Sequence, residues 1–376
     1  MESKKLYIVF DQIPNKSSGG LVATYISLVK LLEKEYDIEI ISIFDCNPEN
    51  KEQFKNNKIN IINKKRINLN FHKVFSYLKE FKLVDTCKCF INGIYYFFKI
   101  PTSKSKIKKL IKEEDKVIVS CPSAAMFMTK KRKFILEIHT DYKYFFGNNT
   151  LGKLQGKLMT KPKLTLFRNK YDAEHAPKYL NPDYIYNFFD NSNSVKNDKL
   201  VKNKILFVGR LEKHKDPLRM IELASKLHKI NKDFILDIYG TGSMENQIQN
   251  KIKELGLENI VTLKGFTSDK NIYKNYSMFW LTSNIEGFPL VIVEAKACGI
   301  PAISTNWGNA VYEAIEDKKD GYVVDNDDDF VQLTNKILTD EKLQKKLSDA
   351  AFKNFDKFSK EKAKEKWVSF LENYKK

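Results

Sequence analysis

Short apolar runs rich in β-branched residues alternate with helix-type patterns along the chain, and this alternation most constrains its fold. It is typical of doubly wound α/β proteins, in which helices cover both faces of a parallel sheet. The basic, aromatic stretch Lys51–Ile111 is predicted to be irregular, with surface helices at Phe71–Phe81 and Lys104–Ile111. In the rest of the first half we expect a helix at Leu21–Glu33 and strands at Leu6–Phe10, Ile38–Phe44, Val117–Ser120 and Phe134–Ile138.

The same alternation restarts after a polar stretch, residues 190–198, which we interpret as an interdomain linker. A chain of 376 residues suits two domains of ordinary size, so the sequence predicts two Rossmann-like domains. The strands expected in the second are Ile205–Val208, Phe234–Tyr239, Ile260–Leu263, Met278–Leu281, Pro301–Ser304 and Tyr322–Val324. The helices expected there and beyond are Pro217–His228, Met244–Leu255, Phe330–Leu338, Glu341–Phe352 and Lys360–Tyr374.

Composition excludes several classes of protein. Charged residues make up 30% of the chain, and no apolar stretch approaches the roughly 20 residues that span a bilayer. The apolar run Leu6–Phe10 is too short for the core of a signal peptide. The five cysteines are scattered without the spacing of a zinc site. We therefore expect a cytoplasmic protein with reduced thiols.

Positive charge is concentrated in the first half of the chain. Of the net charge of +18, residues 1–180 carry +16, from 34 Lys and Arg against 18 Asp and Glu. A lysine-rich composition alone would not predict this asymmetry. Such a field favours an anionic partner: an acidic membrane face, an anionic polymer or a nucleic acid. No RNA-binding motif accompanies the charge, so we expect no nucleic acid.

Two segments of the second half follow predicted strands, at the edge where open α/β sheets bind ligands. The first is Gly209-Arg210 with Lys215 shortly after it. Arginine offers a fork of donors and lysine a point charge, and the two together suit a diphosphate. The second contains Gly240 and Gly242, which would let the backbone approach a ligand closely or would form only a tight turn.

The most specific pattern joins two glutamates, Glu286 and Glu294. Glu286 lies in the loop after a predicted strand, and Pro289 is expected in the first turn of the helix that follows. The amides of Leu290 and Val291 would then offer a positive helix end to phosphate. Glu294 would lie about one turn inside the helix, where it could accept hydrogen bonds from vicinal hydroxyls such as those of ribose.

Two glutamates separated by seven residues, with Gly-Phe after the first and Ala after the second, resemble the EX7E signature of retaining GT-B glycosyltransferases. The chain is most similar to the glycosyltransferase group 1 family, also called family 4. The similarity is close over residues 205–324 and loose elsewhere. It implies a GT-B fold, in which two Rossmann-like domains face a central cleft. Further motifs match in order at Gly209-Arg210, Lys215, Gly240–Gly242, Gly265-Phe266, Gly299–Pro301 and Asp320–Val323.

The resemblance implies a role for each matching residue. Arg210 and Lys215 would bind the donor diphosphate and stabilise the charge on the leaving phosphate. Glu294 would hold the ribose, and Glu286 would contact the sugar near the reacting face. The expected catalytic residues are Glu286, His139, Arg210 and Lys215. The expected donor-binding residues are Gly19, Gly20, Arg210, Lys215, Gly240, Gly242, Phe288, Leu290, Val291 and Glu294.

In the first half, Gly19 and Gly20 resemble the glycine loop of the family. His139 resembles the histidine that contacts the donor sugar, and Asp141 is a further expected acceptor contact. Glu313 aligns with a glutamate of the family, although the residues before it, from Trp307 on, depart from the usual glycine-rich pattern. Diphosphate binding in this family does not require a metal, and no acidic pair follows a predicted strand, so we expect neither a metal nor a cofactor.

The resemblance also implies the domain organisation. Residues 1–190 would form the basic acceptor-side domain and residues 191–357 the domain that binds the nucleotide sugar. A C-terminal helix, residues 358–376, would cross back to the first domain, as it often does in GT-B enzymes.

The function that this implies is retaining transfer of a sugar, expected to come from a UDP-sugar, to a lipid-linked or anionic polymer acceptor in surface glycan synthesis. Basic stretches interleaved with aromatics suit docking on the inner face of an anionic membrane. A protein that binds nucleotide sugars without transfer, a basic nucleic-acid-binding protein and another GT-B enzyme such as an epimerase remain alternatives.

Overall fold

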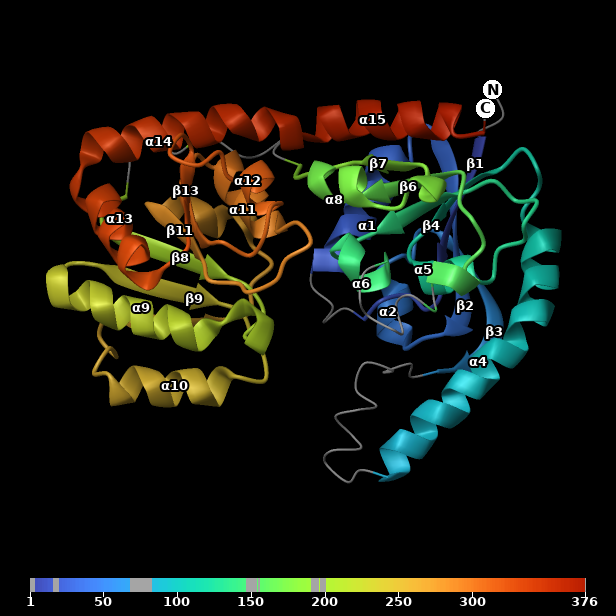
Figure 1. Cartoon of the computed structure of the whole chain (residues 1–376), viewed down its shortest axis with the longest axis horizontal. Helices are drawn as coiled ribbons and strands as arrows, with labels where there is room; N and C mark the ends of the chain where they lie inside the picture. Colours follow the sequence, from blue (N-terminus) through green and yellow to red (C-terminus); the bar gives the residue numbers. More distant parts are fainter. Residues whose placement is uncertain are drawn as a thin grey trace. The chain divides into compact units, whose positions relative to one another are not determined.

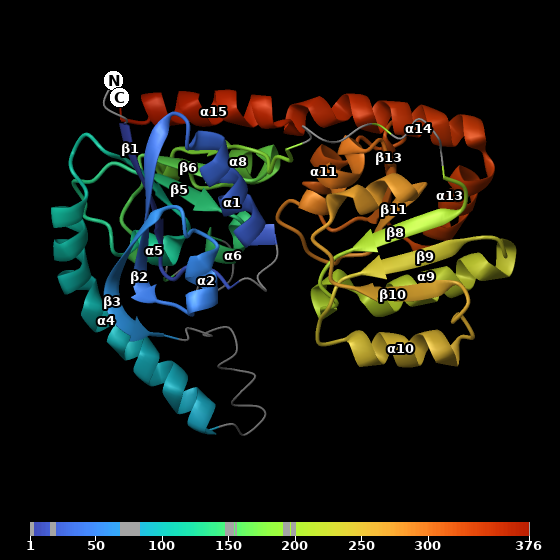
Figure 2. The same cartoon turned by 180° about the vertical axis from the view of Figure 1, so that it is seen from behind.

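The computed structural model describes residues 4–15, 20–67, 83–146, 154, 156–190, 196 and 201–375, without the side chains of residues 83–90. The chain forms two compact units, one mostly blue to green with the red end of the chain, the other mostly yellow to red, in Figures 1 and 2. The first unit comprises Met1–Phe167, Ala173–Tyr184 and Trp367–Lys376, and the second comprises Arg168–Asp172 and Ile185–Lys366. Most of the expected linker lies outside the described residues.

The first unit is built on a sheet of seven parallel strands in the order β3-β2-β1-β4-β5-β6-β7. Its central strands are continuous apolar runs because helices cover both faces of a parallel sheet. The strands are β1 (Lys4–Phe10), β2 (Tyr36–Asp45), β3 (Lys58–Arg66), β4 (Lys116–Val119), β5 (Ile135–Ile138), β6 (Leu164–Phe167) and β7 (Pro182–Tyr184). The helices described here are α1 (Gly20–Leu32), α2 (Pro48–Glu52), α4 (Leu83–Leu110), α5 (Pro122–Ala125), α6 (Tyr142–Phe146) and the 3-10 turn η3 (Lys178–Leu180), together with α8 (Lys170–His175), whose first residues belong to the second unit.

The prediction of an irregular Lys51–Ile111 was wrong. The stretch contains strand β3 and the whole of the long helix α4, and the short helix expected at Lys104–Ile111 is only the end of α4. β3 is an edge strand whose lysines and asparagines interrupt its isoleucines, which removes the apolar run that marks a buried strand. α4 continues through Pro101, a residue that usually ends a helix. The helix expected at Phe71–Phe81 lies outside the described residues.

The second unit holds six parallel strands in the order β10-β9-β8-β11-β12-β13, all at the predicted places. They are β8 (Lys204–Val208), β9 (Ile235–Tyr239), β10 (Val261–Gly265), β11 (Met278–Leu281), β12 (Ala302–Thr305) and β13 (Gly321–Val324). The helices are α9 (Pro217–Ile230), α10 (Glu245–Glu254), α11 (Leu290–Ala297), α12 (Val311–Ala314), α13 (Asp327–Thr339), α14 (Glu341–Asn354) and α15 (Lys360–Asn373), with 3-10 turns η4 (Lys213–Lys215), η5 (Lys270–Asn275) and η6 (Phe355–Phe358).

Alternate residues of the second sheet enter two separate cores. Phe207 and Trp280 pack in the cluster under α9, α10 and α13, whereas Leu206 and Phe279 pack in the cluster with α11 and α12. In Figure 1, α9 and α10 lie side by side in this unit. Both faces of the sheet are therefore covered, as the α/β class predicts.

Strand order reverses once in each sheet, and ligands of open α/β sheets bind outside the carboxyl ends at such a point. In the first sheet β1 lies between β2 and β4, and in the second β8 lies between β9 and β11. These two edges are where the expected site residues and the cavity described below are found.

Helix α15 begins in the second unit, and its last residues belong to the first. Trp367 and Leu371 are buried. The Tyr36 hydroxyl donates a hydrogen bond of 2.8 Å to Glu372 Oε1, and the Val117 amide donates one of 3.0 Å to the Tyr374 hydroxyl. The end of the chain is thus part of the first unit.

Candidate functional site

Three of the expected site residues gather at the carboxyl edge of the second sheet. Arg210 follows β8, Lys215 ends η4, and Glu286 lies in the loop after β11. The Lys215 ammonium is paired with Glu286 Oε1, and the two side chains are only 14% and 11% exposed. The Ser283 hydroxyl donates a second hydrogen bond, of 2.7 Å, to the same oxygen. The Arg210 side chain is exposed and makes no hydrogen bond or ion pair with the described residues.

Two loops are fastened together around this ion pair. The Thr282 hydroxyl donates to the Lys215 carbonyl at 3.0 Å, and the Asn284 amide donates to the His214 carbonyl at 2.9 Å. Asp216 has a left-handed backbone with φ of 47° and leads into α9 at Pro217. The pairing of β11 with β8 therefore fixes Lys215 beside Glu286 before any ligand arrives.

His214 lies among the charged groups at this edge. Burial lowers the pKa of His214, and the charges of Lys215 and Arg210 lower it further, which keeps its imidazole neutral at neutral pH. The Ser243 amide and hydroxyl lower the pKa of Glu212 by hydrogen bonding to its carboxylate. His214 was not singled out from the sequence, because a histidine between two lysines resembles an ordinary charged surface turn.

Gly240 and Gly242 have a structural reason to be glycines. A Cβ on Gly240 would lie 1.8 Å from the carbonyl oxygen of Gly209, and one on Gly242 would lie 2.4 Å from that of Leu211. Gly240 also has a φ of 150°. The loop after β9 therefore packs backbone against backbone on the loop that carries Arg210, and the expected donor contact of these glycines stays a prediction.

Glu294 lies inside α11, the helix that was expected to carry it. The helix begins at Leu290, with Pro289 as its N-cap instead of a first-turn residue. Glu294 is 4% exposed, and its two oxygens accept hydrogen bonds from the Lys270 ammonium at 2.5 Å and the Tyr273 hydroxyl at 2.6 Å. Burial, then the charge of Glu294, raise the pKa of Tyr273, so its hydroxyl stays a donor. Both partners come from η5, which no sequence pattern connects with the glutamate.

The Phe288 ring lies in the core of the second unit. It is 6% exposed, and its centroid lies 5.2 Å from that of Tyr186 and 5.4 Å from that of Phe358. Side-chain amides hold the backbone around it. Asn187 Nδ2 donates to the Phe288 carbonyl at 2.9 Å, and Asn169 Nδ2 donates to the Gly287 carbonyl at 3.2 Å.

Glu313 holds the beginning of α8. Its carboxylate accepts hydrogen bonds from the amides of Lys170 and Tyr171 at 2.8 and 2.7 Å and from the Tyr186 hydroxyl at 2.9 Å. The first amides of a helix have no partner within it, and a carboxylate there also meets the positive end of the helix dipole. The structure thus assigns Glu313 a task in the fold.

The remaining expected residues belong to the first unit. Gly20 opens α1, and Gly19 lies outside the described residues. His139 follows β5, with its Nε2 3.0 Å from the Tyr25 hydroxyl and 4.0 Å from Oε1 of the buried Glu137. Asp141 accepts a hydrogen bond of 2.7 Å from the Lys143 amide at the start of α6, which is a local structural role.

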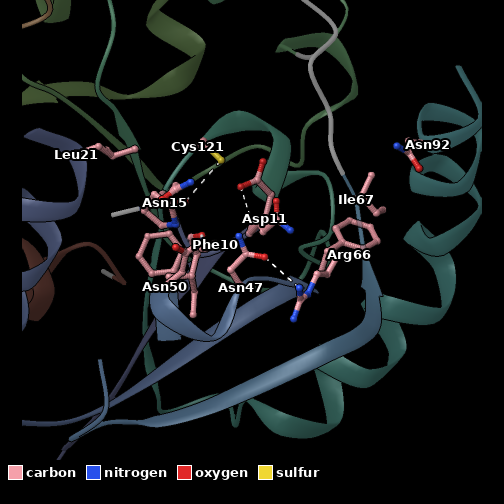
Figure 3. Close-up of a pocket in the computed structure, with 15 residues that line it drawn as sticks. Phe10, Asp11, Asn15, Leu21, Asn47, Asn50, Arg66, Ile67, Asn92 and Cys121 are labelled. Atoms are coloured by element: carbon pink, nitrogen blue, oxygen red, sulfur yellow. Dashed lines mark hydrogen bonds between the residues drawn. The ribbon is translucent and has the colours of Figure 1, made fainter. Parts of the chain in front are cut away.

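The first unit also contains a cavity of about 720 Å³ at the carboxyl ends of its strands (Figure 3). Side-chain amides predominate among its polar lining groups. The sequence did not predict the cavity, because its walls come from separate segments after β1, β2, β3 and β4 and from α4. The lining residues are Phe10, Asp11, Gln12, Ile13, Pro14, Asn15, Leu21, Phe44, Asn47, Asn50, Arg66, Ile67, Asn92, Ser120 and Cys121.

Asp11 and Arg66 are the charged residues in that lining. Asp11 accepts hydrogen bonds of 2.7 Å from the Ser123 hydroxyl and from the Gln12 amide, and burial raises the pKa of its carboxyl. Arg66 is exposed and donates to Asn47 Oδ1 at 3.0 Å, as drawn in Figure 3. The cavity thus offers one arginine, one carboxyl and several amides.

Within the described ranges, no group of three or more His, Cys, Asp or Glu side chains could hold a metal ion. The same part of the chain contains no helix long and apolar enough to cross a bilayer.

Comparison with known proteins adds the family. The family model described as "Glycosyl transferases group 1" matches residues 189–354. A Campylobacter jejuni protein named N-acetylgalactosamine-N,N'-diacetylbacillosaminyl-diphospho-undecaprenol 4-alpha-N-acetylgalactosaminyltransferase is 31% identical over 299 residues, covering 71% of this chain and 80% of its own. A second alpha-1,4-N-acetyl-D-galactosaminyltransferase of C. jejuni, whose name includes a diNAcBac-PP-undecaprenol glycan, is 24% identical over 96% of this chain and 98% of its own.

Solved structures share the fold across the chain. A point mutant of Staphylococcus aureus TarM, in complex with Fondaparinux, alpha-GlcNAc-glycerol and UDP, matches with a TM-score of 0.74 and 16% identity. The match covers 98% of this chain and 99% of TarM. This likeness confirms the predicted GT-B fold. Together with the sequence relatives, it shows that the chain belongs to the glycosyl transferases group 1 family and is a glycosyltransferase.

Proposed function

We propose that this enzyme transfers a sugar from a UDP-sugar to a lipid-linked acceptor, with retention at the anomeric carbon, in the synthesis of a surface glycan. The observation that carries the proposal is the Lys215–Glu286 ion pair beside Arg210 at the switch point of the second sheet. The UDP in the TarM complex supports the donor, and the undecaprenol-linked glycans in the names of the two C. jejuni relatives support the acceptor. An anionic polymer remains the alternative acceptor.

The donor diphosphate would bind between Arg210 and Lys215. Arg210 is exposed and can turn its guanidinium to the phosphates, whereas Lys215 is already fixed by Glu286. The first amides of α11, at Leu290 and Val291, have no partner within the helix and suit an anion. A carboxylate offers about four lone pairs, so Glu294 can accept ribose hydroxyls while it keeps its bond to Tyr273.

In the reaction, the bond between the anomeric carbon and the diphosphate oxygen breaks, and its electron pair stays on that oxygen. Arg210 and Lys215 would stabilise the charge that develops there, which is usually the largest catalytic contribution. A hydroxyl of the acceptor forms the new bond on the same face of the sugar and gives its proton to the departing phosphate oxygen. Same-face attack leaves the anomeric configuration unchanged. The products are the glycosylated acceptor and UDP.

Glu286 would have two roles in this site. Its Oε1 accepts from both Lys215 and Ser283, while its Oε2 accepts no hydrogen bond from the described residues. The free oxygen can accept a hydroxyl of the donor sugar, and the occupied one keeps Lys215 in place. His139, in the first unit, is the residue that we expect to contact the same sugar.

The acceptor glycan would occupy the cavity of the first unit. A volume of about 720 Å³ lies within the range of ligand pockets. Amide side chains can pair with both donors and acceptors, which suits sugar hydroxyls and acetamido groups. Asp11, with its raised pKa, keeps its proton to higher pH than an exposed aspartate and can donate a hydrogen bond in the cavity. The amide-bearing residues of the lining are Gln12, Asn15, Asn47, Asn50 and Asn92.

A panel of nucleotide sugars tests the proposal. Purified protein is incubated with each donor, with and without lipid extract, and release of the nucleoside diphosphate is measured. We expect release with one or a few UDP-sugars and a strong increase when lipid extract is present. The anomeric configuration of the product, read by NMR, tests retention.

Each alternative has its own outcome. Binding of a nucleotide sugar without release would indicate a binding protein, and an inverted product would contradict retention. Release that depends on an anionic polymer instead of lipid would assign the other acceptor. Absence of both release and binding with every donor in the panel would sink the proposal.

A further inference from the structure

The first half of α4 presents an apolar face to solvent. Ile91, Ile94 and Phe98 are 60%, 58% and 77% exposed, and their spacing of three and four residues puts them on one face of the helix. Tyr96 lies on the opposite face, is 3% exposed and donates its hydroxyl to the Ser123 carbonyl at 2.7 Å. Soluble proteins rarely expose neighbouring large apolar side chains unless that surface binds something.

The inner face of α4 is well anchored, so the outward direction of the apolar face is a property of the fold. Ser103 and Ile107 are 0% and 2% exposed. Two hydrogen bonds tie the helix to strand β3: Asn63 Nδ2 of the strand donates to Ser103 Oγ at 2.9 Å, and the Lys106 ammonium donates to the Ile62 carbonyl of the strand at 3.0 Å. Figures 1 and 2 both show α4 running along the β3 edge and extending beyond the sheet.

Basic residues follow this apolar face along α4 and lie on the strand beside the helix. Between residues 91 and 110 the helix has five lysines and no acidic residue. The neighbouring strand β3 exposes Lys64, Lys65 and Arg66. Burial, then the charge of Lys130, lower the pKa of Lys104, which places the basic stretch at residues 130–133 close to the same helix. Like charges held this close gain from an anionic partner.

We propose that α4 docks on an anionic lipid bilayer. Ile91, Ile94 and Phe98 insert at the boundary between headgroups and acyl chains, and the exposed lysines, such as Lys108 and Lys109, lie on lipid phosphates. An apolar face bordered by lysines is the pattern of helices that lie in the membrane interface. The inference deepens the proposed function, and it rests on that function only for the idea that the acceptor is anchored in lipid.

Docking through α4 would bring the acceptor cavity to the membrane surface. The same helix contributes Asn92 to the lining of the cavity (Figure 3), while Ile91 and Ile94 are exposed to solvent. A glycan anchored in the bilayer could then enter the cavity without leaving the lipid.

A second copy of the chain is the main competing occupant of this face. In a two-fold dimer the same patch meets itself, so the lysines of both copies would be brought together. That repulsion, set against the attraction to lipid phosphates, favours the membrane.

Vesicle flotation tests the docking surface without any donor or acceptor. Wild-type protein is floated with vesicles of phosphatidylcholine and with vesicles that also contain phosphatidylglycerol, across a salt series. We expect binding to the acidic vesicles that weakens as salt increases. The variant I91S/I94S/F98S and the variant K108E/K109E are each expected to lose binding at least about tenfold.

Matched changes in the second unit serve as controls. Ile230 and Phe352 are 48% and 36% exposed, and Lys345 and Lys346 are exposed on α14. The variants I230S/F352S and K345E/K346E should bind acidic vesicles within about twofold of wild type, because they leave α4 unchanged. Unchanged thermal unfolding of the α4 variants would show that they fold.

The inference would be overturned by equal binding to neutral and acidic vesicles, or by wild-type flotation of both α4 variants. It would also be overturned if the protein bound no vesicles and instead sedimented as a dimer that the I91S/I94S/F98S substitutions abolish. Turnover is measured separately, with a detergent-dispersed lipid extract. If wild-type protein floats normally but shows no turnover in this assay, the proposed function is contradicted and the docking surface is not. The α4 variants are expected to lose flotation and to keep normal turnover.

Discussion

At the scale of single residues, the ion pair of Lys215 and Glu286 has most influence on the proposed chemistry. Both side chains are largely buried, and the loop contacts of Thr282 and Asn284 fix their positions. A lysine held in advance needs little reorganisation when negative charge develops nearby, which is the main source of electrostatic catalysis.

We therefore predict that Lys215→Ala lowers kcat by about a hundredfold or more, because one preorganised cation is lost from the leaving phosphate. Glu286→Ala should also lower kcat, because Lys215 loses the carboxylate that positions it. Steady-state release of nucleoside diphosphate measures both. Lys251→Ala on α10 is a control from the same unit and should leave turnover unchanged. Wild-type rates in both site variants would refute the roles assigned here.

A second residue pair governs stability. The Lys296 ammonium lies 2.6 Å from Asp320 Oδ2, and both side chains are fully buried. Asp320 also accepts hydrogen bonds from the Glu316 amide at 2.9 Å and from Asn354 Nδ2 at 2.8 Å. Removing one partner of such a pair leaves the other charge buried without compensation.

Asp320→Asn is accordingly expected to lower the free energy of unfolding by about 3–5 kcal/mol. Burial lowers the pKa of Lys296 to about 8 from 10.5, although Asp320 opposes the shift. Between about pH 8 and 10.5, Lys296 binds more protons in the unfolded chain than in the folded protein, so stability rises with pH in this range. Without Asp320 the pKa of Lys296 in the folded protein falls further. The loss in free energy of unfolding, variant against wild type, should therefore shrink from neutral pH to about pH 9. Urea unfolding at both pH values measures it; an equal deficit would contradict this account.

At the scale of elements, the loops after the strands are shaped by close backbone packing. The loop with Gly240 lies directly on the loop that carries Arg210, with no room for a side chain. Gly256 has a positive φ of 63°, but a Cβ there would meet nothing within 4 Å. A side chain at Gly256 would strain only the backbone, whereas one at Gly240 would also clash with the neighbouring loop.

We predict that Gly240→Ala costs clearly more stability than Gly256→Ala and also weakens donor binding, because it displaces the loop of Arg210. Gly256→Ala should cost about 1–2 kcal/mol from its left-handed backbone alone and leave donor affinity unchanged. Thermal unfolding and titration with UDP measure the two effects. Equal losses in both variants would show that clash with Gly209 does not matter.

At the scale of the whole molecule, α15 belongs to both compact units. Its first residues pack in the second unit, where Lys360 pairs with Asp190 at 2.7 Å. Its last residues lie in the first unit, where Glu372 bonds to β2 and Tyr374, just after the helix, bonds to β4. The helix therefore contributes side chains to the packing of both units.

Trp367→Ala should lower the free energy of unfolding by about 3–5 kcal/mol, because the indole is 1% exposed and its removal leaves a large cavity. Calorimetry and near-UV circular dichroism follow the loss. Ser369→Ala, at an exposed position of the same helix, is the control and should change stability by less than about 0.5 kcal/mol. If the tryptophan variant is as stable as wild type, the end of α15 does not support the first unit.

Much of the fold follows from the sequence alone, because a parallel strand that is buried on both faces has an uninterrupted apolar sequence. Strands β8 and β11 are such runs, and the other four strands of the second sheet could be predicted from short segments that remain mostly apolar, as in the edge strand β10, where Thr262 is the one interruption between Ile260 and Leu263. Strand β3 and helix α4 could not, because an edge strand needs only partial apolarity and a helix packed on a sheet can tolerate Pro101.

The sequence by itself determined the family, the α/β class and the placement of Arg210, Lys215, Glu286 and Glu294 at strand ends and at a helix start, since these depend on local order along the chain. Only the tertiary structure decided which side chains meet. It joined Lys215 to Glu286 and Tyr273 to Glu294, and it formed a cavity from segments that are far apart in the sequence. It also turned one face of α4 to solvent. Partners distant in sequence are chosen by strand order and packing, for which a single sequence carries no local signal.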